Sequence, residues 1–355
     1  MSHPSVVDVF PDQPDGYEWI DGEPEFDASR HLQLEAPEES WSLAELGYSE
    51  TFIERQASPT AMFSPARMLS DEGVTALHET MRLLRPHIRQ VPDSHRATGY
   101  LRGTVFISRF IRDLCRNEDI TAFASDLFGT PLVPHTMVYQ QGHMNFAPRH
   151  ISKPVDGWHY DFVGFDYVLM CHDPATYKGG DFKYFLGTRE EGHAIVSRGD
   201  TIPDDRVVTP HFPGAGYACF MQGSAVYHCA SPLEETAERA SLVNAYVSLD
   251  VTKPDPTRTF FITPEGPYDW IEKEPETKHR YAEYARHTAW LGREKLSFLL
   301  STLPLDADRD AALNALREAA SCIERAIETL EIGPQHFEKM EELRRRQDKD
   351  LFGGE

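Results

Sequence analysis

The chain has 355 residues, 40% of them hydrophobic and 26% charged, which is an ordinary composition for a globular protein that buries a substantial core. Its formal net charge of −22 disfavours binding to nucleic acid or to an anionic membrane surface, because both require a cationic footprint. No run of 18 uncharged apolar residues occurs, and the N-terminal residues lack the basic and apolar regions of a secretory signal, so we expect neither a membrane span nor secretion.

The N-terminal third of the chain is expected to form an arm followed by helices. Residues 1–50 are acidic, contain proline and have few periodic apolar positions, so we expect an extended or loosely packed arm. Residues 70–89 carry apolar side chains at helical spacing behind Ser70, which is a plausible N-cap. Two further helical patterns run through residues 106–114 and 120–129.

From about residue 131 the sequence changes to short β-type runs separated by Gly, Pro and Asp. Many short strands with turn residues between them predict an antiparallel sandwich or barrel, so the expected fold class is mainly β with flanking helices. The expected strands are Leu132–Tyr139, Phe165–Met170, Asp181–Leu186, Ala194–Ser197, Tyr217–Phe220 and Leu242–Leu249.

The C-terminal part is predicted to be helical from about residue 276. Asp306 or Asp308 can cap a helix whose apolar stripe stops at Gly333-Pro334, and the charged segment 338–346 indicates a solvated helix. An apolar stripe requires a partner surface on this chain or on a second copy, so a homodimer through these helices is one expectation. The predicted organisation is an arm at 1–50, a domain at 51–275 with its β core at about 131–255, and a helical extension at 276–355.

The cysteines bear on the cellular compartment. There are five, an odd number, and no CxxC pair occurs. This pattern favours reduced thiols in a cytoplasmic protein over a disulfide framework or a zinc ribbon.

Within the β region, Trp158-His159-Tyr160-Asp161 is the most informative stretch. Residues i and i+2 of a strand point to the same face, so His159 and Asp161 can reach one metal ion together. An HxD tripeptide alone often occurs by chance, but His228 supplies a third candidate ligand from a distant strand. Two histidines and one carboxylate form the facial triad of non-haem Fe(II) oxygenases, which leaves metal positions open for a co-substrate and O₂.

A candidate clamp for a carboxylate follows the second histidine. In the run Arg239–Val247, alternate residues share a face, which places Arg239 and Ser241 together. A guanidinium offers a planar fork for a carboxylate, and a hydroxyl can add a hydrogen bond. The competing interpretation is a surface arginine in a cluster of glutamates; the spacing from His228 favours the clamp. Upstream, Tyr139, with Gln141 and Asn145, lines the pocket or serves only in strand packing.

These residues resemble the Fe(II)/2-oxoglutarate-dependent dioxygenases, a family with a double-stranded β-helix (jelly-roll) core. The resemblance covers about residues 131–255, and the histidine-to-arginine spacing is similar to that of the phytanoyl-CoA hydroxylase-like branch. It rests on His159-Tyr160-Asp161, Gly179-Gly180-Asp181-Phe182, the Pro213–Phe220 turn and strand, His228 and Arg239-Ala240-Ser241.

The resemblance implies that His159, Asp161 and His228 bind Fe(II), and that Arg239, with Ser241 and Tyr139 as further candidates, binds 2-oxoglutarate. Such an enzyme consumes 2-oxoglutarate and O₂, releases succinate and CO₂, and oxidises a C–H bond of a small-molecule substrate. We expect hydroxylation first, with desaturation or cyclisation as other outcomes of the same cofactors. Related halogenases lack the aspartate, so Asp161 disfavours halogenation.

Two other classes stay open at this point. One is a metal-dependent cupin without redox chemistry, such as an isomerase, which usually has more histidine ligands and no downstream arginine. The other is a β-sandwich binding protein in which the triad is coincidental. The identity of the substrate is not readable from the sequence.

Overall fold

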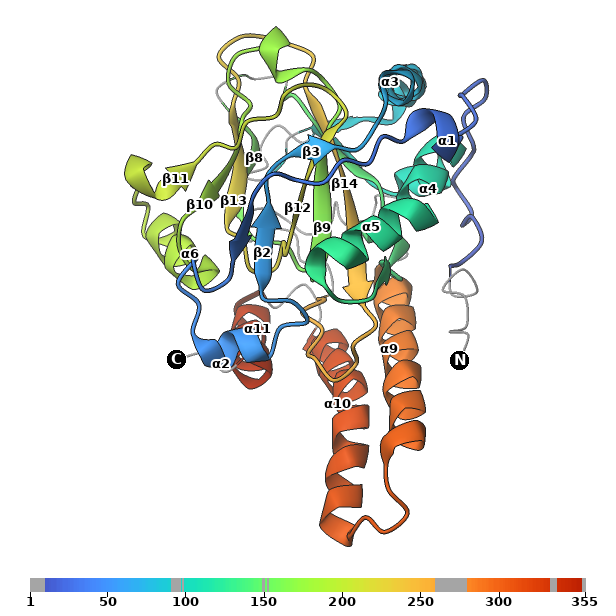
Figure 1. The fold of residues 1–355 in the computed structure, drawn as a ribbon, viewed down its shortest axis with the longest axis vertical. Helices are drawn as coiled ribbons and strands as arrows, with labels where there is room; N and C mark the ends of the chain where they lie inside the picture. The colour runs from blue at the N-terminus through green and yellow to red at the C-terminus, as the bar shows by residue number, and fades with distance from the viewer. Residues whose placement is uncertain are drawn as a thin grey trace.

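Eight antiparallel strands form a two-sheet sandwich at the centre of the molecule (Figure 1). The computed structural model describes residues 10–90, 97, 99–148, 151, 153–258, 280–332 and 337–352. The central strand orders are β7-β14-β9-β12 and β8-β13-β10-β11. The chain passes repeatedly from one sheet to the other, which is jelly-roll connectivity. The predicted mainly β fold with flanking helices is therefore confirmed.

The strands of the two sheets are short except for one. The smaller sheet contains β8 (Pro154–His159), β13 (His228–Pro232), β10 (Phe182–Phe185) and β11 (Val207–Val208). The central strands of the larger sheet are β7 (His143–Phe146), β14 (Ala240–Ser248), β9 (Phe165–Met170) and β12 (Tyr217–Met221). Its remaining strands are β1 (Ser40–Ser42), β2 (Thr60–Phe63), β3 (Ala66–Arg67), β4 (Arg89–Gln90), β5 (Gly99–Leu101) and β6 (Leu132–Pro134).

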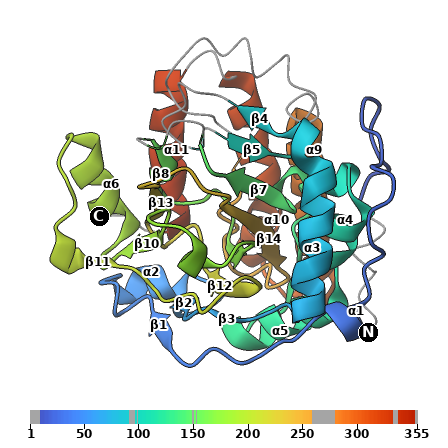
Figure 2. The same ribbon diagram turned by 90° about the horizontal axis from the view of Figure 1, so that it is seen from above.

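Strand β9 separates two hydrophobic cores. Tyr167 and Leu169 pack outward in the cluster that contains the helices α3 (Asp71–Leu84), α4 (Arg109–Cys115) and α5 (Glu118–Phe128). Val168 and Met170 point between the sheets, toward residues such as Phe182 of the opposite sheet. Both faces of β9 are buried, which explains why apolar and polar residues do not alternate along this strand. Figure 2 shows α3 and α4 on one side of the sandwich and α6 on the other.

The predicted helix signals operate as expected. The Ser70 hydroxyl accepts a hydrogen bond from the N–H of Gly73 at 3.0 Å and begins α3, and α5 ends at Gly129, whose φ of 64° is readily adopted by glycine. The shorter helices are α1 (Ala28–His31), α2 (Glu50–Glu54) and α6 (Arg189–Ser197), with 3₁₀ turns at Arg85–His87, Thr104–Phe106, Val138–Gln140, Pro174–Thr176 and Asp204–Arg206.

The predicted helical extension is confirmed. It consists of α9 (Arg280–Thr302), α10 (Arg309–Ile332) and α11 (Phe337–Phe352). Asp308 caps α10, since its Oδ1 accepts a hydrogen bond from the N–H of Ala311 at 2.8 Å. Helices α9 and α10 form a hairpin that projects beyond the sandwich (Figure 1). No helix in the described part of the chain is long and apolar enough to cross a membrane.

Three local expectations are wrong. The strand expected at Ala194–Ser197 is the end of α6, which begins where the Thr188 hydroxyl caps the N–H of Glu191. The strand expected at Leu132–Tyr139 stops at Pro134, and a 3₁₀ turn follows. The arm is not loosely packed near its end, because Leu43 and Leu46 are buried and β1 pairs with β2.

Candidate metal centre

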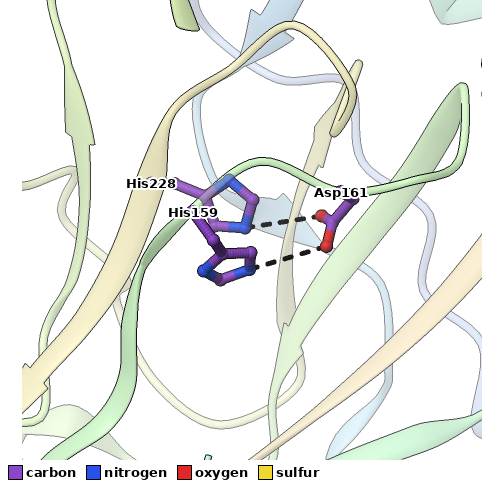
Figure 3. Close-up of side chains that lie close together, drawn as sticks. All are labelled: His159, Asp161 and His228. Atoms are coloured by element: carbon purple, nitrogen blue, oxygen red, sulfur yellow. Dashed lines mark ion pairs between the residues drawn. The ribbon is translucent and has the colours of Figure 1, made fainter. Parts of the chain in front are cut away.

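His159, Asp161 and His228 meet at one end of the smaller sheet (Figure 3). His159 is the last residue of β8 and His228 the first of β13, and the two residues face each other in the antiparallel register. Asp161 lies just beyond β8, where its N–H donates to the carbonyl of Gly223 at 2.8 Å. The structure therefore brings together all three metal ligands predicted from the sequence.

The spacing of the three side chains fits a shared ion. Nε2 of His159 lies 3.5 Å from Oδ1 of Asp161, and Nε2 of His228 lies 3.4 Å from Oδ2. All three ligand atoms are within 4.8 Å of one another. Atoms that each bind one ion at roughly 2.0–2.2 Å must lie roughly 3–4 Å apart. Elsewhere in the described residues, no other group of three such side chains has this spacing.

The hydrogen bonds of both imidazoles leave the correct nitrogen for a metal. Nδ1 of His159 lies 2.6 Å from the carbonyl oxygen of Gly157, and Nδ1 of His228 lies 2.9 Å from that of Val226. A carbonyl oxygen only accepts, so Nδ1 carries the proton in each ring. The lone pair of Nε2 then points toward Asp161, as a ligand for a metal ion requires.

The electrostatic environment favours neutral histidine and a bound cation. His228 is 5% exposed; its burial, followed by the charge of His159, lowers its pKa to about 4. A metal ligand must be the neutral imidazole, so this histidine needs no deprotonation at neutral pH. The carboxylate of Asp161 supplies the negative charge that offsets part of the charge of a divalent ion.

A second carboxyl group, Asp166, lies behind Asp161 and was not predicted. Asp166 is fully buried on β9; burial, followed by the charge of Asp161, raises its pKa well above the ordinary value. A Cβ on Gly223 would lie 2.0 Å from Oδ2 of Asp166 and 2.7 Å from Oδ2 of Asp161. Gly223 thus leaves space for both carboxyl groups. An acid in the apolar run Phe165–Met170 was the available sequence signal.

A polar chain that the sequence analysis also missed leads away from His159. Oδ1 of the buried Asp156 lies 3.7 Å from Nδ1 of His159, and Nδ2 of Asn145 donates to Oδ2 of Asp156 at 3.2 Å. The Arg102 guanidinium donates to Oδ1 of Asn145 at 3.2 Å from two nitrogens. Such outer partners fix the orientation of a metal ligand. Asn145 was named as a candidate pocket residue, and the structure places it in this chain.

Arg239 and Ser241 lie on the inner face of the larger sheet. Arg239 is 2% exposed; its Nη1 donates to the Ser241 hydroxyl at 3.1 Å and its Nε to the carbonyl of Gly180 at 3.1 Å. Burial lowers the pKa of Arg239, while Tyr177, Cys171 and Asp156 oppose that shift. The two predicted clamp residues therefore share a face, as the alternation required.

The Gly179-Gly180 pair has a structural role beside this arginine. Both residues have positive φ, 71° and 68°, which favours glycine. A Cβ on Gly179 would lie 2.4 Å from the carbonyl oxygen of Pro232, and one on Gly180 would lie 2.9 Å from Leu233. Glycine therefore allows β10 to approach the end of β13 and lets Gly180 accept the bond from Arg239.

A cavity of about 350 Å³ adjoins the clamp. Met170, which pairs with Ser241, lines it, as does Phe182, whose ring centroid lies 5.6 Å from that of His228. The cavity therefore lies near both the clamp and the histidine. Its other lining residues are Asp173, Pro174, Ala175, Tyr177, Gly180, Asp181, Thr209, Pro210, His211, Phe212 and Pro213.

Tyr139 lies in a 3₁₀ turn and not in the strand expected for it. It is 4% exposed, and its N–H donates to Oε2 of Glu283 in α9 at 2.9 Å. This contact joins the turn to the helical extension. A role of Tyr139 in cofactor binding stays a prediction.

Among the comparisons with known proteins, only those with solved structures found similarity. No family profile matches the chain, and no curated protein matches it. Solved structures of other proteins align with it at low identity. The non-haem α-ketoglutarate-dependent epimerase SnoN from nogalamycin biosynthesis has 19% identity and a TM-score of 0.38, over 58% of this chain and 83% of its own.

Two further solved structures are similar to a comparable extent. The non-haem α-ketoglutarate-dependent carbocyclase SnoK, from the same biosynthesis, has 15% identity and a TM-score of 0.40, over 66% of this chain and 92% of its own. EctD from S. alaskensis with bound Fe has 14% identity and a TM-score of 0.39, over 73% and 88%. Functional conclusions for this chain therefore rest on its own side chains.

Proposed function

We propose that this protein is an Fe(II)- and 2-oxoglutarate-dependent oxygenase that hydroxylates an unactivated C–H bond of a small molecule. The observation that carries the proposal is the convergence of one ligand atom from each of His159, Asp161 and His228 within 4.8 Å. Two imidazoles and one carboxylate are the donor set of non-haem iron oxygenases. The structurally similar SnoN and SnoK are named as α-ketoglutarate-dependent enzymes, and one SnoN structure holds Fe³⁺ and α-ketoglutarate.

The protein's own residues have separable tasks in this proposal. His159, Asp161 and His228 hold the metal on one face and leave its other positions for small ligands. Arg239 and Ser241 hold the far carboxylate of 2-oxoglutarate, because a buried guanidinium next to a hydroxyl suits a carboxylate. Bound Fe(II) and 2-oxoglutarate supply, with O₂, the oxidising power that removes a substrate hydrogen, with release of succinate and CO₂.

The cavity next to the clamp is large enough for a small ligand. Its volume of about 350 Å³ is in the range of small-molecule sites. Phe182, Phe212 and Tyr177 are among the residues that line it. Desaturation or cyclisation would use the same metal and clamp. Membership of the phytanoyl-CoA hydroxylase-like branch rests on the spacing of His228 and Arg239 alone. A cytoplasmic location is supported by five free, buried thiols.

The first experiment tests the metal and co-substrate together. Purified protein is loaded anaerobically with Fe(II) and 2-oxoglutarate, the visible charge-transfer band is recorded, and candidate small molecules are screened for a change in the band. Succinate formation is then measured in air. We expect the band and iron-dependent succinate. Protein that binds neither iron nor 2-oxoglutarate would exclude this function.

Arg239→Ala distinguishes the oxygenase from a metal-dependent cupin without redox chemistry. In the oxygenase, the substitution weakens 2-oxoglutarate binding by roughly 10- to 100-fold and leaves iron content unchanged, because a charge-assisted carboxylate pair is lost. Arg198→Ala, at an exposed arginine of the α6 C-terminus, is the matched control. Equal 2-oxoglutarate affinity in both variants would favour the cupin.

His228→Ala distinguishes either enzyme from a binding protein with a coincidental triad. Iron content is measured in the parent, in His228→Ala and in His87→Ala, where the histidine is exposed and far along the chain from the ligands. We expect loss of iron in the first variant alone. Unchanged iron content in all three proteins would favour the binding protein.

A further inference from the structure

The α9–α10 hairpin carries a large apolar surface. Among the residues that the structure describes, every large hydrophobic side chain that is at least 36% exposed lies between 296 and 330. A concentration of exposed large apolar side chains on one part of a protein marks an interaction surface. The residues are Leu296, Phe298, Leu300, Leu303, Leu305, Leu313, Leu316, Ile323, Ile327 and Leu330.

Helix α10 has two apolar seams, and the inner one is buried within the chain. The inner seam has small residues at spacings of three and four: Ala319, Cys322, Ala326 and Thr329 are all buried. Cys322 packs with Trp290 and Leu291 of α9. Small side chains let α9 and α10 approach closely, so this face of α10 is covered by α9.

The outer seam of α10 has the heptad pattern of a helix-packing interface. Its positions alternate three and four residues apart over the length of the helix, at Leu313, Leu316, Ala320, Ile323, Ile327 and Leu330. The five large residues of this seam are 36–56% exposed. A sustained heptad of leucine and isoleucine predicts knobs-into-holes packing against another helix.

The apolar surface continues from α10 to α9. A Cβ on Gly292 would lie 3.1 Å from Cδ1 of Ile323, so Ile323 of the outer seam lies against α9. Leu296, Leu300 and Leu303 follow Gly292 toward the tip of the hairpin at helical spacing, and antiparallel packing places them beside Leu316 and Leu313.

We propose that two copies of this chain associate through their α9–α10 hairpins in an intermolecular helical bundle. The same patch on both copies would form a symmetric interface, since a two-fold contact joins identical surfaces. Packing of the outer seam against the same seam of a second copy would remove apolar surface from water on both chains. The hairpin projects beyond the sandwich, so the body of the enzyme does not block a second hairpin (Figure 1).

Charge favours a second copy over a membrane surface as the partner. Helices that lie on membranes usually have a basic polar face. The outer seam of α10 is instead flanked by Glu324, Glu328 and Glu331 as well as by Arg317, and the whole chain has a net charge of −22. Repulsion between two such chains is screened by salt, so the dimer is expected to tighten as salt concentration rises.

Sedimentation equilibrium of the full chain tests the proposal with two matched variants. Leu316→Glu places a charge in the outer seam, and Asn314→Glu places the same charge two residues away on an exposed position. We expect the parent to sediment at twice the chain mass of 40.3 kDa at about 50 μM. Leu316→Glu should raise the dimer dissociation constant at least about 100-fold, and Asn314→Glu less than about 3-fold.

Each other result would overturn the proposal. A parent protein that is monomeric at this concentration contradicts it, including one that instead sediments with phosphatidylcholine vesicles. A dimer that both variants weaken equally, or neither weakens, lies on another surface. Circular dichroism checks that Leu316→Glu keeps its helices; Leu316→Gln repeats the test if it does not. Iron content is read in parallel and should be the same in all samples.

Discussion

Two clusters of histidine and aspartate differ in how closely their side chains approach one another. In the metal centre, both Nδ1 atoms bind backbone carbonyls, and the Nε2 atoms stay 3.4–3.5 Å from the oxygens of Asp161. In the other cluster, Nε2 of His287 lies 2.7 Å from Oδ2 of Asp255, and Nδ1 lies 2.7 Å from the Thr136 hydroxyl.

In the second cluster, which we call the closed cluster, the side chains of His287 and Asp255 are joined to each other and to Thr136 and Thr257 by short hydrogen bonds. Oδ1 of Asp255 accepts hydrogen bonds from the N–H and the hydroxyl of Thr257 at 3.1 and 2.8 Å. Burial raises the pKa of Asp255, but the charge and hydrogen bond of His287 outweigh that effect and hold the pKa well below its ordinary value. Since each of these atoms has a short partner, no ligand position is left. The distances between the side chains, rather than the residue types, therefore distinguish a candidate metal site from a structural cluster.

Asp161→Ala removes the carboxylate from the candidate metal centre and has the largest expected effect. Loss of one of three protein ligands should lower the rate of succinate formation at least about 1,000-fold, equivalent to about 4 kcal/mol. The free energy of unfolding should change little, because Asp161 is partly exposed at the end of a strand. Iron content and turnover are the measurements. Full turnover in the variant would contradict the metal assignment.

His287→Ala breaks the closed cluster. Removal of the imidazole leaves Oδ2 of Asp255 without its hydrogen-bond partner, which should lower the free energy of unfolding by roughly 3 kcal/mol. Urea unfolding measures the change, with the exposed His87→Ala as control. Iron affinity of the folded variant should match that of the parent. A variant that keeps its stability but loses iron would reverse the roles assigned to the two clusters.

Gly223→Ala tests whether the candidate metal centre needs the space that glycine leaves beside Asp161 and Asp166. The added methyl group would lie on the carboxyl groups of Asp161 and Asp166, so we expect iron to bind roughly 10- to 100-fold more weakly. Gly214→Ala is the control, since its methyl group meets only one atom, at 4.0 Å. Equal iron affinity in the two variants would show that the carboxyl groups move without cost.

Glu283→Gln tests the surroundings of the closed cluster and has the smallest expected effect. Burial raises the pKa of Glu283 from 4.5 to about 7, so the folded protein keeps a proton that the unfolded chain loses above about pH 4.5. The parent therefore loses stability as the pH rises from about 4.5 to 7. Glutamine removes this loss and keeps an acceptor for the N–H of Tyr139.

The expected readout is a difference that depends on pH. Thermal unfolding of Glu283→Gln and the parent should differ little at pH 5, and the variant should be more stable by about 1–2 kcal/mol at pH 8. The substitution Glu79→Gln, at an exposed glutamate, is the matched control. A difference that is the same at both pH values would mean that Glu283 does not titrate in this range.

The sequence by itself determined the fold class and predicted the three side chains that meet in the candidate metal centre. Turn residues between short β runs predict a sandwich, and the order His159, Asp161, His228, Arg239 carries its meaning through fixed spacing along strands. Helix ends at Ser70 and Gly129 were readable because capping is a local interaction. The stripe on α10 was likewise visible from its period.

Only the tertiary structure decided which contacts surround those ligands. Asp156, Asp166 and Gly223 lie on different segments of the chain, and paired strands and a loop bring them to Asp161 and His159 in the candidate metal centre. The strand expected at Ala194–Ser197 became a helix because a cap at Thr188 and packing overrode β propensity. Local sequence patterns determine the periodicity and the ends of helices and strands. The burial, the charge and the hydrogen bonds of a side chain depend on residues that folding brings from elsewhere in the chain.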